Sequence, residues 1–170
     1  YLPYSVAAQQ TWHDNGGVNV LSQRRADGKR QTEPHSRGIK QRFRRDDRFR
    51  RQQGALRLRP PFSPRPRNQG LWNRSLDSLA QLQHYDNLYV LMGDFNSTWD
   101  HASFRYLLGS RFLDSGQQAG EGLHMTYPAM MPIAEIDHIV HDKGVTVGDL
   151  ETKYIAGSDH RALLATLEVA

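Results

Sequence analysis

Polar side chains that can transfer protons or bind cations stand where a short apolar strand is expected to end. Asp94 and Asn96 follow the apolar run 88–92. Residues two apart in extended backbone share one face, so these two side chains would point together while Phe95 turns into packing. Carboxylates are both proton acceptors and ligands for hard cations. Gly93, Asp94 and Asn96 would equally suit a plain strand-to-turn junction, so this stretch alone leaves both interpretations open.

Three further polar groups occur later in the chain. They are Thr126 with Tyr127, then Asp137, then Asp159 with His160. Residues 135–140 alternate, which predicts a strand with Ile136, His138 and Val140 on one face and Asp137 with Ile139 on the other. An unpaired carboxylate beside an isoleucine is costly, so Asp137 is expected to have a partner.

Two other chemistries fit these residue types less well. Ser158, Asp159 and His160 include the residues of a catalytic triad, but sequence neighbours cannot form its chain of contacts, which argues against acyl transfer. His138 and His141 have a spacing that suits zinc on a helix. They fall in a predicted strand, where that spacing puts them on opposite faces.

The elements that must position these groups follow an α/β pattern. Residues 72–84 carry apolar side chains at helical spacing, which predicts a helix that begins near Asn68 or Asn73. Residues 88–92 are uniformly apolar, which is typical of a strand covered on both faces. Asp100 is expected to cap a second helix that ends at Gly109, and residues 110–122 are expected to be mostly loop. Further strands are expected at 144–147 and 161–169.

The charge of the chain is divided very unevenly. Residues 24–67 hold 16 Lys and Arg against 4 Asp and Glu, a net of +12, whereas the remainder holds 6 against 14, a net of −8. The segment has few apolar residues and cannot build a core. It is therefore expected to be disordered.

Three interpretations of residues 24–67 remain open. The segment could be a basic arm for nucleic acid, with Phe43 and Phe49 available to stack on bases. It could be a solvated stretch without a partner. It could also be frameshift-derived, because a G+C-rich gene read in a shifted frame yields arginine-rich, lysine-poor sequence.

Length and composition exclude several classes of protein. A chain of 170 residues fits one domain or part of a larger one, and Tyr1 in place of a methionine suggests a cut N-terminus. No apolar run approaches the ~18 residues of a membrane helix, although a membrane or export segment could precede this sequence, so localisation stays open. Zero cysteines exclude disulfides and thiolate nucleophiles.

Taken together, the motifs GDFN, MTYP, IDHI and SDHRALLATL occur in an order that resembles the endonuclease/exonuclease/phosphatase family of metal-dependent phosphodiesterases. The resemblance covers residues 68–170 well and 17–22 faintly. It implies a four-layer α/β sandwich, two β-sheets flanked by helices, of which this chain would hold the C-terminal half. The N-terminal half would be incomplete or disordered.

The resemblance also implies roles for individual residues. Asp94 would orient or deprotonate the attacking water and Asn96 would hold Asp94 and contact the phosphate, while His160 would donate to a phosphoryl oxygen with Asp137 paired to its other nitrogen. Asp159, with Asp94 and Asn96, would bind Mg²⁺ or Mn²⁺. Thr126 and Tyr127 would contact the substrate. The roles are consistent with phosphodiester hydrolysis, which needs an oriented water and stabilised phosphoryl charge.

The sequence departs from the family pattern upstream of residue 68. No strand with the family's metal-binding glutamate is present, and residues 56–61 lack the histidine that the family places in a comparable strand. We therefore expect a monomeric, partial and bacterial α/β protein with a remnant strand in 1–23, the basic segment 24–67, and the C-terminal half of the domain in 68–170.

The expected function of such a chain is Mg²⁺-dependent hydrolysis of a phosphate ester, in a molecule that truncation could have inactivated. The substrate class stays open among nucleic acid, a phospholipid head group and a sugar phosphate. The alternative is a non-catalytic nucleic-acid-binding protein that uses residues 24–67.

Overall fold

The computed structural model describes residues 18–23, 54–58, 65–120 and 122–169. Its strands and helices, in chain order, are β1 (Val18–Gln23), β2 (Gly54–Leu58), α1 (Gln69–Ala80), the 3-10 helix η2 (Gln81–His84), β3 (Leu88–Asp94), α2 (Ala102–Leu108), β4 (Phe112–Asp114), α3 (Ser115–Ala119), β5 (Asp137–Asp142), β6 (Val145–Lys153) and β7 (Ala162–Val169).

The described strands form one sheet of five strands, in the order β2-β1-β3-β5-β4, and a second sheet of β6 and β7. Every pairing is antiparallel. Because β3 and β4 both run antiparallel to β5, they run parallel to each other, and α2 lies on the connection between them. The segment β3-α2-β4 is therefore a crossover that skips one strand position.

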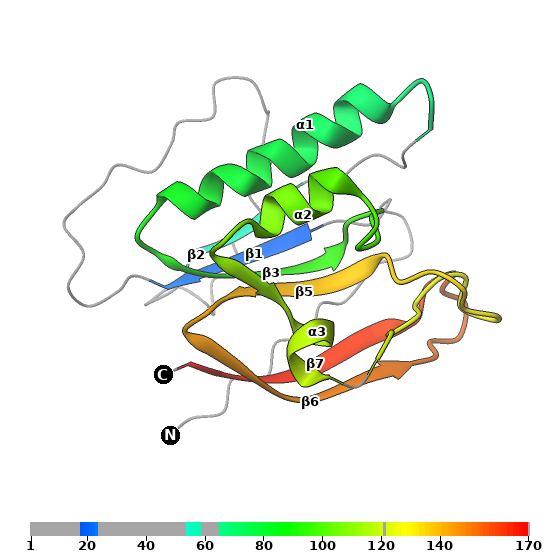
Figure 1. Cartoon of the computed structure of the whole chain (residues 1–170). Coiled ribbons are helices and arrows are strands. Elements are labelled where there is room, and N and C mark those ends of the chain that lie inside the picture. The colour runs from blue at the N-terminus through cyan, green and yellow to red at the C-terminus, as the bar shows by residue number, and fades with distance from the viewer. Residues whose placement is uncertain (1–17, 24–53, 59–64, 121, 170) are drawn as a thin grey trace.

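Figure 1 shows three layers: α1 and α2 cover one face of the five-stranded sheet, and β6, β7 and α3 lie on the other side. Successive side chains of β3 point to opposite faces of the sheet, which explains this arrangement. Tyr89 and Leu91 pack in the core under the helices, whereas Val90 and Met92 pack in a second core with β6 and β7. The uniformly apolar sequence of β3 is thus buried on both faces, as predicted.

The α/β class predicted from sequence is confirmed, with two antiparallel sheets and covering helices. The first predicted helix is α1, which begins after Asn68 and continues as η2 to His84. The strands predicted at 144–147 and 161–169 are β6, which is longer, and β7.

Two details around α2 differ from the expectation. The residue before α2 is His101, so Asp100 is not its cap. Residues 110–122 are not mostly loop, because they contain β4 and α3. Strand β4 has only three residues, and its burial follows from pairing with β5 rather than from a pattern of its own.

The basic segment 24–67 is described only in part. Residues 54–58 form strand β2, which pairs with β1, and so contribute to the large sheet a strand that the composition did not predict. The rest of the segment up to residue 64, 24–53 and 59–64, lies outside the described residues. The interpretations of a basic arm and of a frameshift fall on those residues and stay untested.

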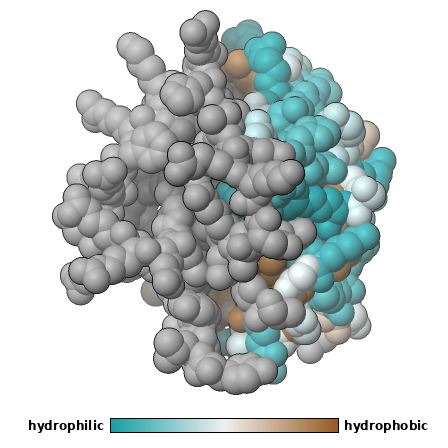
Figure 2. All heavy atoms as spheres, turned by 90° about the vertical axis from the view of Figure 1, so that its left-hand side faces the viewer, coloured by the Kyte–Doolittle hydropathy of each residue, from teal (hydrophilic) through white to brown (hydrophobic). Residues whose placement is uncertain are grey.

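One side of the molecule shows a largely polar surface where described residues are visible (Figure 2). Figure 2 shows mostly hydrophilic side chains, with scattered hydrophobic ones, where described residues are visible on that side of the molecule. No helix in the described part of the chain is long and apolar enough to cross a membrane.

One arginine ties the segment before β3 to the end of β5. The guanidinium of Arg111 donates to both carboxylate oxygens of Asp142, at 2.7 and 2.8 Å, and to the carbonyl oxygens of Leu82, Gln83, Tyr85 and Asn87. The Asp142 carboxylate is buried and also accepts the backbone N–H of Tyr89. Arg111 thus supplies the countercharge for a buried acid and closes the turn that leads into β3.

Replacing Arg111 by leucine is expected to lower the free energy of unfolding by about 3–5 kcal/mol, because Asp142 would be left as an uncompensated buried charge. The double variant Arg111→Leu with Asp142→Asn should recover part of this loss. Urea denaturation measures both, with Arg74→Leu on the exposed side of α1 as the control, expected to change stability by about 0.5 kcal/mol or less. Equal losses for Arg111→Leu and Arg74→Leu would contradict this role.

Candidate active site

The pairing of β3 with β5 places two carboxylates side by side. Asp94 is the last residue of β3 and Asp137 the first of β5, and the antiparallel register sets them directly opposite each other. Both residues are almost buried, at 7% and 9% exposure. Residues 43 positions apart in the sequence therefore meet at one end of the sheet.

Asn96 lies just beyond the strand, in a turn, where it is held against Asp94. Its backbone N–H donates to Oδ1 of Asp94 at 2.7 Å and its side-chain amide donates to Oδ2 at 3.0 Å. Its φ of 49° is left-handed, a conformation that asparagine tolerates better than most residues. Of the two interpretations that the sequence left open, the structure has the strand-to-turn junction, and it is the turn that brings the amide to the carboxylate. Phe95 is fully buried, as predicted.

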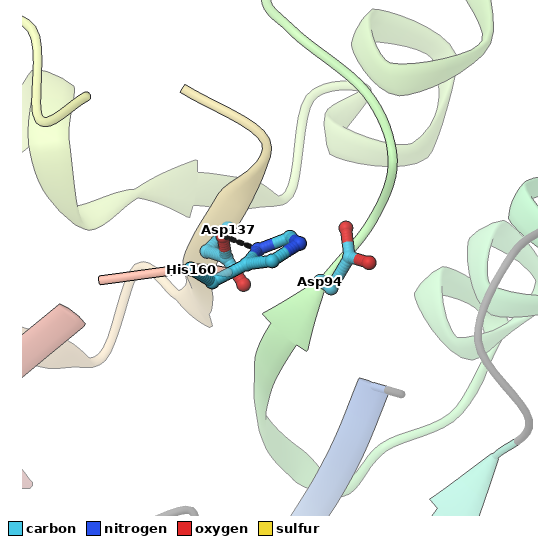
Figure 3. A group of neighbouring side chains, drawn as sticks. All are labelled: Asp94, Asp137 and His160. Carbon is cyan, nitrogen blue, oxygen red and sulfur yellow. Dashed lines mark hydrogen bonds and ion pairs between the residues drawn. The ribbon is translucent and has the colours of Figure 1, made fainter. Parts of the chain in front are cut away.

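His160 completes the group from the segment that precedes β7. Its Nδ1 lies 2.7 Å from Oδ2 of Asp137, which supplies the partner that Asp137 was expected to need. Figure 3 shows the other ring nitrogen directed toward Asp94. Potential ligand atoms of Asp94, Asp137 and His160 all lie within 4.8 Å of one another.

The surroundings of Asp94 make its carboxylate unusually basic. Burial, and next the negative charge of Asp137, raise the pKa of Asp94 to about 6, against the opposing hydrogen bond from the Asn96 backbone. For His160, burial disfavours the charged ring. The hydrogen bond and charge of Asp137 more than offset this, so the pKa of His160 is raised. The two groups suit a proton acceptor and a proton donor near neutral pH.

The remaining residues predicted for the site lie around this group. Thr126 is fully buried and its Oγ1 accepts the backbone N–H of Asp137 at 3.4 Å, so it lies behind that carboxylate. Tyr127 is 39% exposed and its ring centroid lies 4.9 Å from that of His160. The Asp159 side chain is exposed and does not belong to the group formed by Asp94, Asp137 and His160. Ser158 accepts the backbone N–H of His160 and makes no triad contact.

Sequence reasoning missed a second carboxylate–imidazole pair beside the site. Nδ1 of His138 lies 2.8 Å from Oδ2 of Asp114, and both side chains are buried. His138 was predicted on the face opposite Asp137, and this is confirmed by the strand β5. The signal was a polar residue on the apolar face of that strand, but nothing in the sequence identified Asp114 as its partner.

The donor set fits a hard divalent cation. Asp94 and Asp137 offer carboxylate oxygens, and Asn96 adds a carboxamide next to Asp94. Two neighbouring acids in a nearly buried position raise the pKa of Asp94, and a cation there would relieve the repulsion that contributes to this shift. The residues present are therefore compatible with the cation that the resemblance implies.

The fold and the site together define a class of protein: a layered α/β domain with a carboxylate–carboxamide–imidazole centre at the end of its central strand. A model of the Endonuclease/Exonuclease/phosphatase family matches residues 6–160. The chain belongs to this family, as the sequence motifs indicated, and the family comprises nuclease- and phosphatase-type hydrolases of phosphoesters. No curated protein and no solved structure was found to match the chain.

The raised pKa of Asp94 has a consequence for stability. A carboxylate whose folded pKa lies above its unfolded value of 3.8 makes the folded state less stable as pH rises from about 4 to 6. A shift of about two units corresponds to about 3 kcal/mol. Asp94→Asn removes this penalty but also weakens the contact with the Asn96 amide.

We therefore expect Asp94→Asn to raise the free energy of unfolding by about 1–2 kcal/mol at pH 7.5 without divalent cations, and to leave it nearly unchanged at pH 4. Denaturant unfolding at the two pH values, in chelator, measures the difference. Asp77→Asn, on the exposed side of α1, is the control. A variant less stable than wild type at pH 7.5 would contradict the assigned penalty.

Proposed function

We propose that this chain hydrolyses phosphate esters with the help of Mg²⁺ or Mn²⁺. The observation that carries the proposal is the convergence of Asp94 with the Asp137–His160 pair: potential ligand atoms of these three residues lie within 4.8 Å of one another. Asn96 holds the Asp94 carboxylate in place. Family membership supports the reaction class, and the pKa directions of Asp94 and His160 support the division of roles between them.

Asp94 is the residue proposed to orient and deprotonate the attacking water. Its raised pKa makes it a better proton acceptor than an ordinary carboxylate, and Asn96 fixes its orientation through two hydrogen bonds. The water oxygen forms the new bond to phosphorus while the ester P–O bond breaks. The proton of the water passes to Asp94, and the departing alcohol takes a proton from solvent.

His160 is proposed to donate a hydrogen bond from Nε2 to a phosphoryl oxygen as negative charge develops there. Asp137 contacts the other ring nitrogen, which fixes the orientation of the ring and favours its protonated form by raising the pKa of His160. Thr126 supports Asp137 by accepting a hydrogen bond from its backbone N–H, and Tyr127, whose ring lies against that of His160, is proposed to contact the group attached to the phosphate.

Asp94 and Asn96 would hold the cation, with Asp159 as the further ligand proposed from the motif. When bound, a hard divalent cation supplies charge neutralisation for the phosphoryl oxygens. Asp159 follows closely after the turn at residues 156–157, and its exposed side chain adjoins His160 in sequence. Asp159 is proposed as a ligand from the sequence motif alone. Asp94 and Asn96 are proposed from the motif and also contact each other in the structure.

Purified protein is expected to cleave bis(p-nitrophenyl) phosphate only when Mg²⁺ or Mn²⁺ is present. Asp94→Ala should abolish this activity, whereas Asp77→Ala, an exposed acid on α1, should retain it within about twofold. Release of p-nitrophenol with and without chelator provides the measurement. Equal rates for wild type and Asp94→Ala would rule out the catalytic proposal.

The pH dependence of the rate should be bell-shaped. Activity should rise as Asp94 ionises, at or below pH 6, and fall on the alkaline side as His160 loses its proton above its ordinary pKa of 6.5. In Asp137→Asn, the pKa of His160 loses the support of the carboxylate, so the alkaline limb should move to lower pH. The profile of kcat/KM tests this, and an alkaline limb unchanged by Asp137→Asn would show that His160 is not the donor.

A further inference from the structure

A buried ion pair outside the proposed mechanism lies directly behind the turn that carries Asn96. The side chains of His138 and Asp114 are 1% and 2% exposed and lie 2.8 Å apart. Asp114 also accepts the indole N–H of Trp99 at 2.8 Å and the backbone N–H of Gly116 at 3.1 Å. The carboxylate therefore has three donors and is held firmly.

Both nitrogens of the His138 ring face hydrogen-bond acceptors. Nδ1 faces the Asp114 carboxylate, and Nε2 lies 2.7 Å from the carbonyl oxygen of Ser97. Donation to both acceptors requires both ring protons, so the two contacts favour the imidazolium form of His138. Consistently, although burial opposes the charged form, the hydrogen bond and charge of Asp114 raise the pKa of His138.

A contact to the Ser97 carbonyl constrains Asn96, because Ser97 is the next residue in the chain. The backbone on the other side of Asn96 is also tied, since the Trp72 indole donates to the carbonyl oxygen of Phe95 at 3.3 Å and the Phe95 N–H donates to Ile136 at 2.9 Å. The left-handed backbone of Asn96 is thus anchored before and after the turn, and the anchor after it is the His138 ring.

Packing leaves this anchor little freedom. The His138 ring lies 4.3 Å from the ring of Phe104 and 5.8 Å from that of Phe95, centroid to centroid. A buried ion pair is a poor source of stability, because removing two charges from water offsets most of their attraction. A fixed, doubly donating ring is, however, well suited to holding one carbonyl oxygen in one place.

We propose that the Asp114–His138 pair is a positioning device for Asn96, and through it for Asp94. The pair fixes the Ser97 carbonyl, which keeps the Asn96 amide directed at the Asp94 carboxylate. Neither residue touches the substrate. The contribution to catalysis rests on the proposed function, whereas the effect on Asn96 does not.

The test uses His138→Gln and Asp114→Asn in the full chain. His141→Gln is the matched control, because His141 is also a fully buried histidine of β5, three residues further along the strand, and its Nδ1 bonds the carbonyl oxygen of Asp142 rather than that of Ser97. Far-UV circular dichroism and cooperative thermal unfolding establish that each variant is folded. Trp99→Phe, which removes one donor to Asp114, is a milder variant should both substitutions prevent folding.

The first measurement is the ¹⁵N–¹H spectrum. The backbone and side-chain amide resonances of Asn96 should shift or broaden in the His138 and Asp114 variants, and to a smaller extent in Trp99→Phe, but not in His141→Gln. Asn96 resonances that coincide with those of wild type in the folded variants would overturn the proposal, whether or not the protein is active.

The second measurement is turnover of bis(p-nitrophenyl) phosphate with Mg²⁺. His138→Gln and Asp114→Asn should lower kcat about 10–100-fold, in the range found when residues that orient active-site groups are removed, with little change in KM. An unchanged kcat in a variant whose Asn96 resonances move would overturn the catalytic part of the proposal. An inactive wild type would contradict the proposed function and leave the spectroscopic test intact.

Discussion

The antiparallel pairing of β3 with β5 is the constraint on which the site depends. Its register sets Asp94 opposite Asp137. Because side chains alternate along a strand, a slip of one residue would turn every side chain of β5 to the other face. Asp137 would then lose its contact with His160, and His138 would lose its contact with Asp114. The apolar residues that specify the register, such as Val140 under the helices and Ile139 toward β6 and β7, therefore also specify the chemistry.

Most buried carboxylates in the described part of the chain have a positively charged or imidazole partner, whereas Asp94 does not. Asp142 is paired with Arg111, Asp114 with His138 and Asp137 with His160. Asp94, in contrast, accepts hydrogen bonds from Asn96 but forms no ion pair with a residue in the described part of the chain, and its pKa is raised to about 6. An acid held in an unfavourable environment is a common feature of catalytic sites, because the same burial that costs stability creates a proton acceptor near neutral pH.

The sequence by itself determined the α/β class, the buried strand β3 and the residues of the candidate centre. These features are local. A uniformly apolar run predicts a strand covered on both faces, alternation predicts which side of β5 Asp137 occupies, and the motifs identify the family. The sequence also predicted that Asp137 has a partner, because an unpaired carboxylate on an apolar face is costly.

Only the tertiary structure decided which residues are partners. The pairing of His138 with Asp114, the strand β2 inside the basic segment, and the β4 and α3 elements in an expected loop all depend on contacts between distant residues. So does the choice between extended backbone and a turn at Asn96, where the structure has a left-handed turn. Short elements with no pattern of their own are stabilised by the strands they meet, and that information lies in the register of the sheet rather than in any one stretch of sequence.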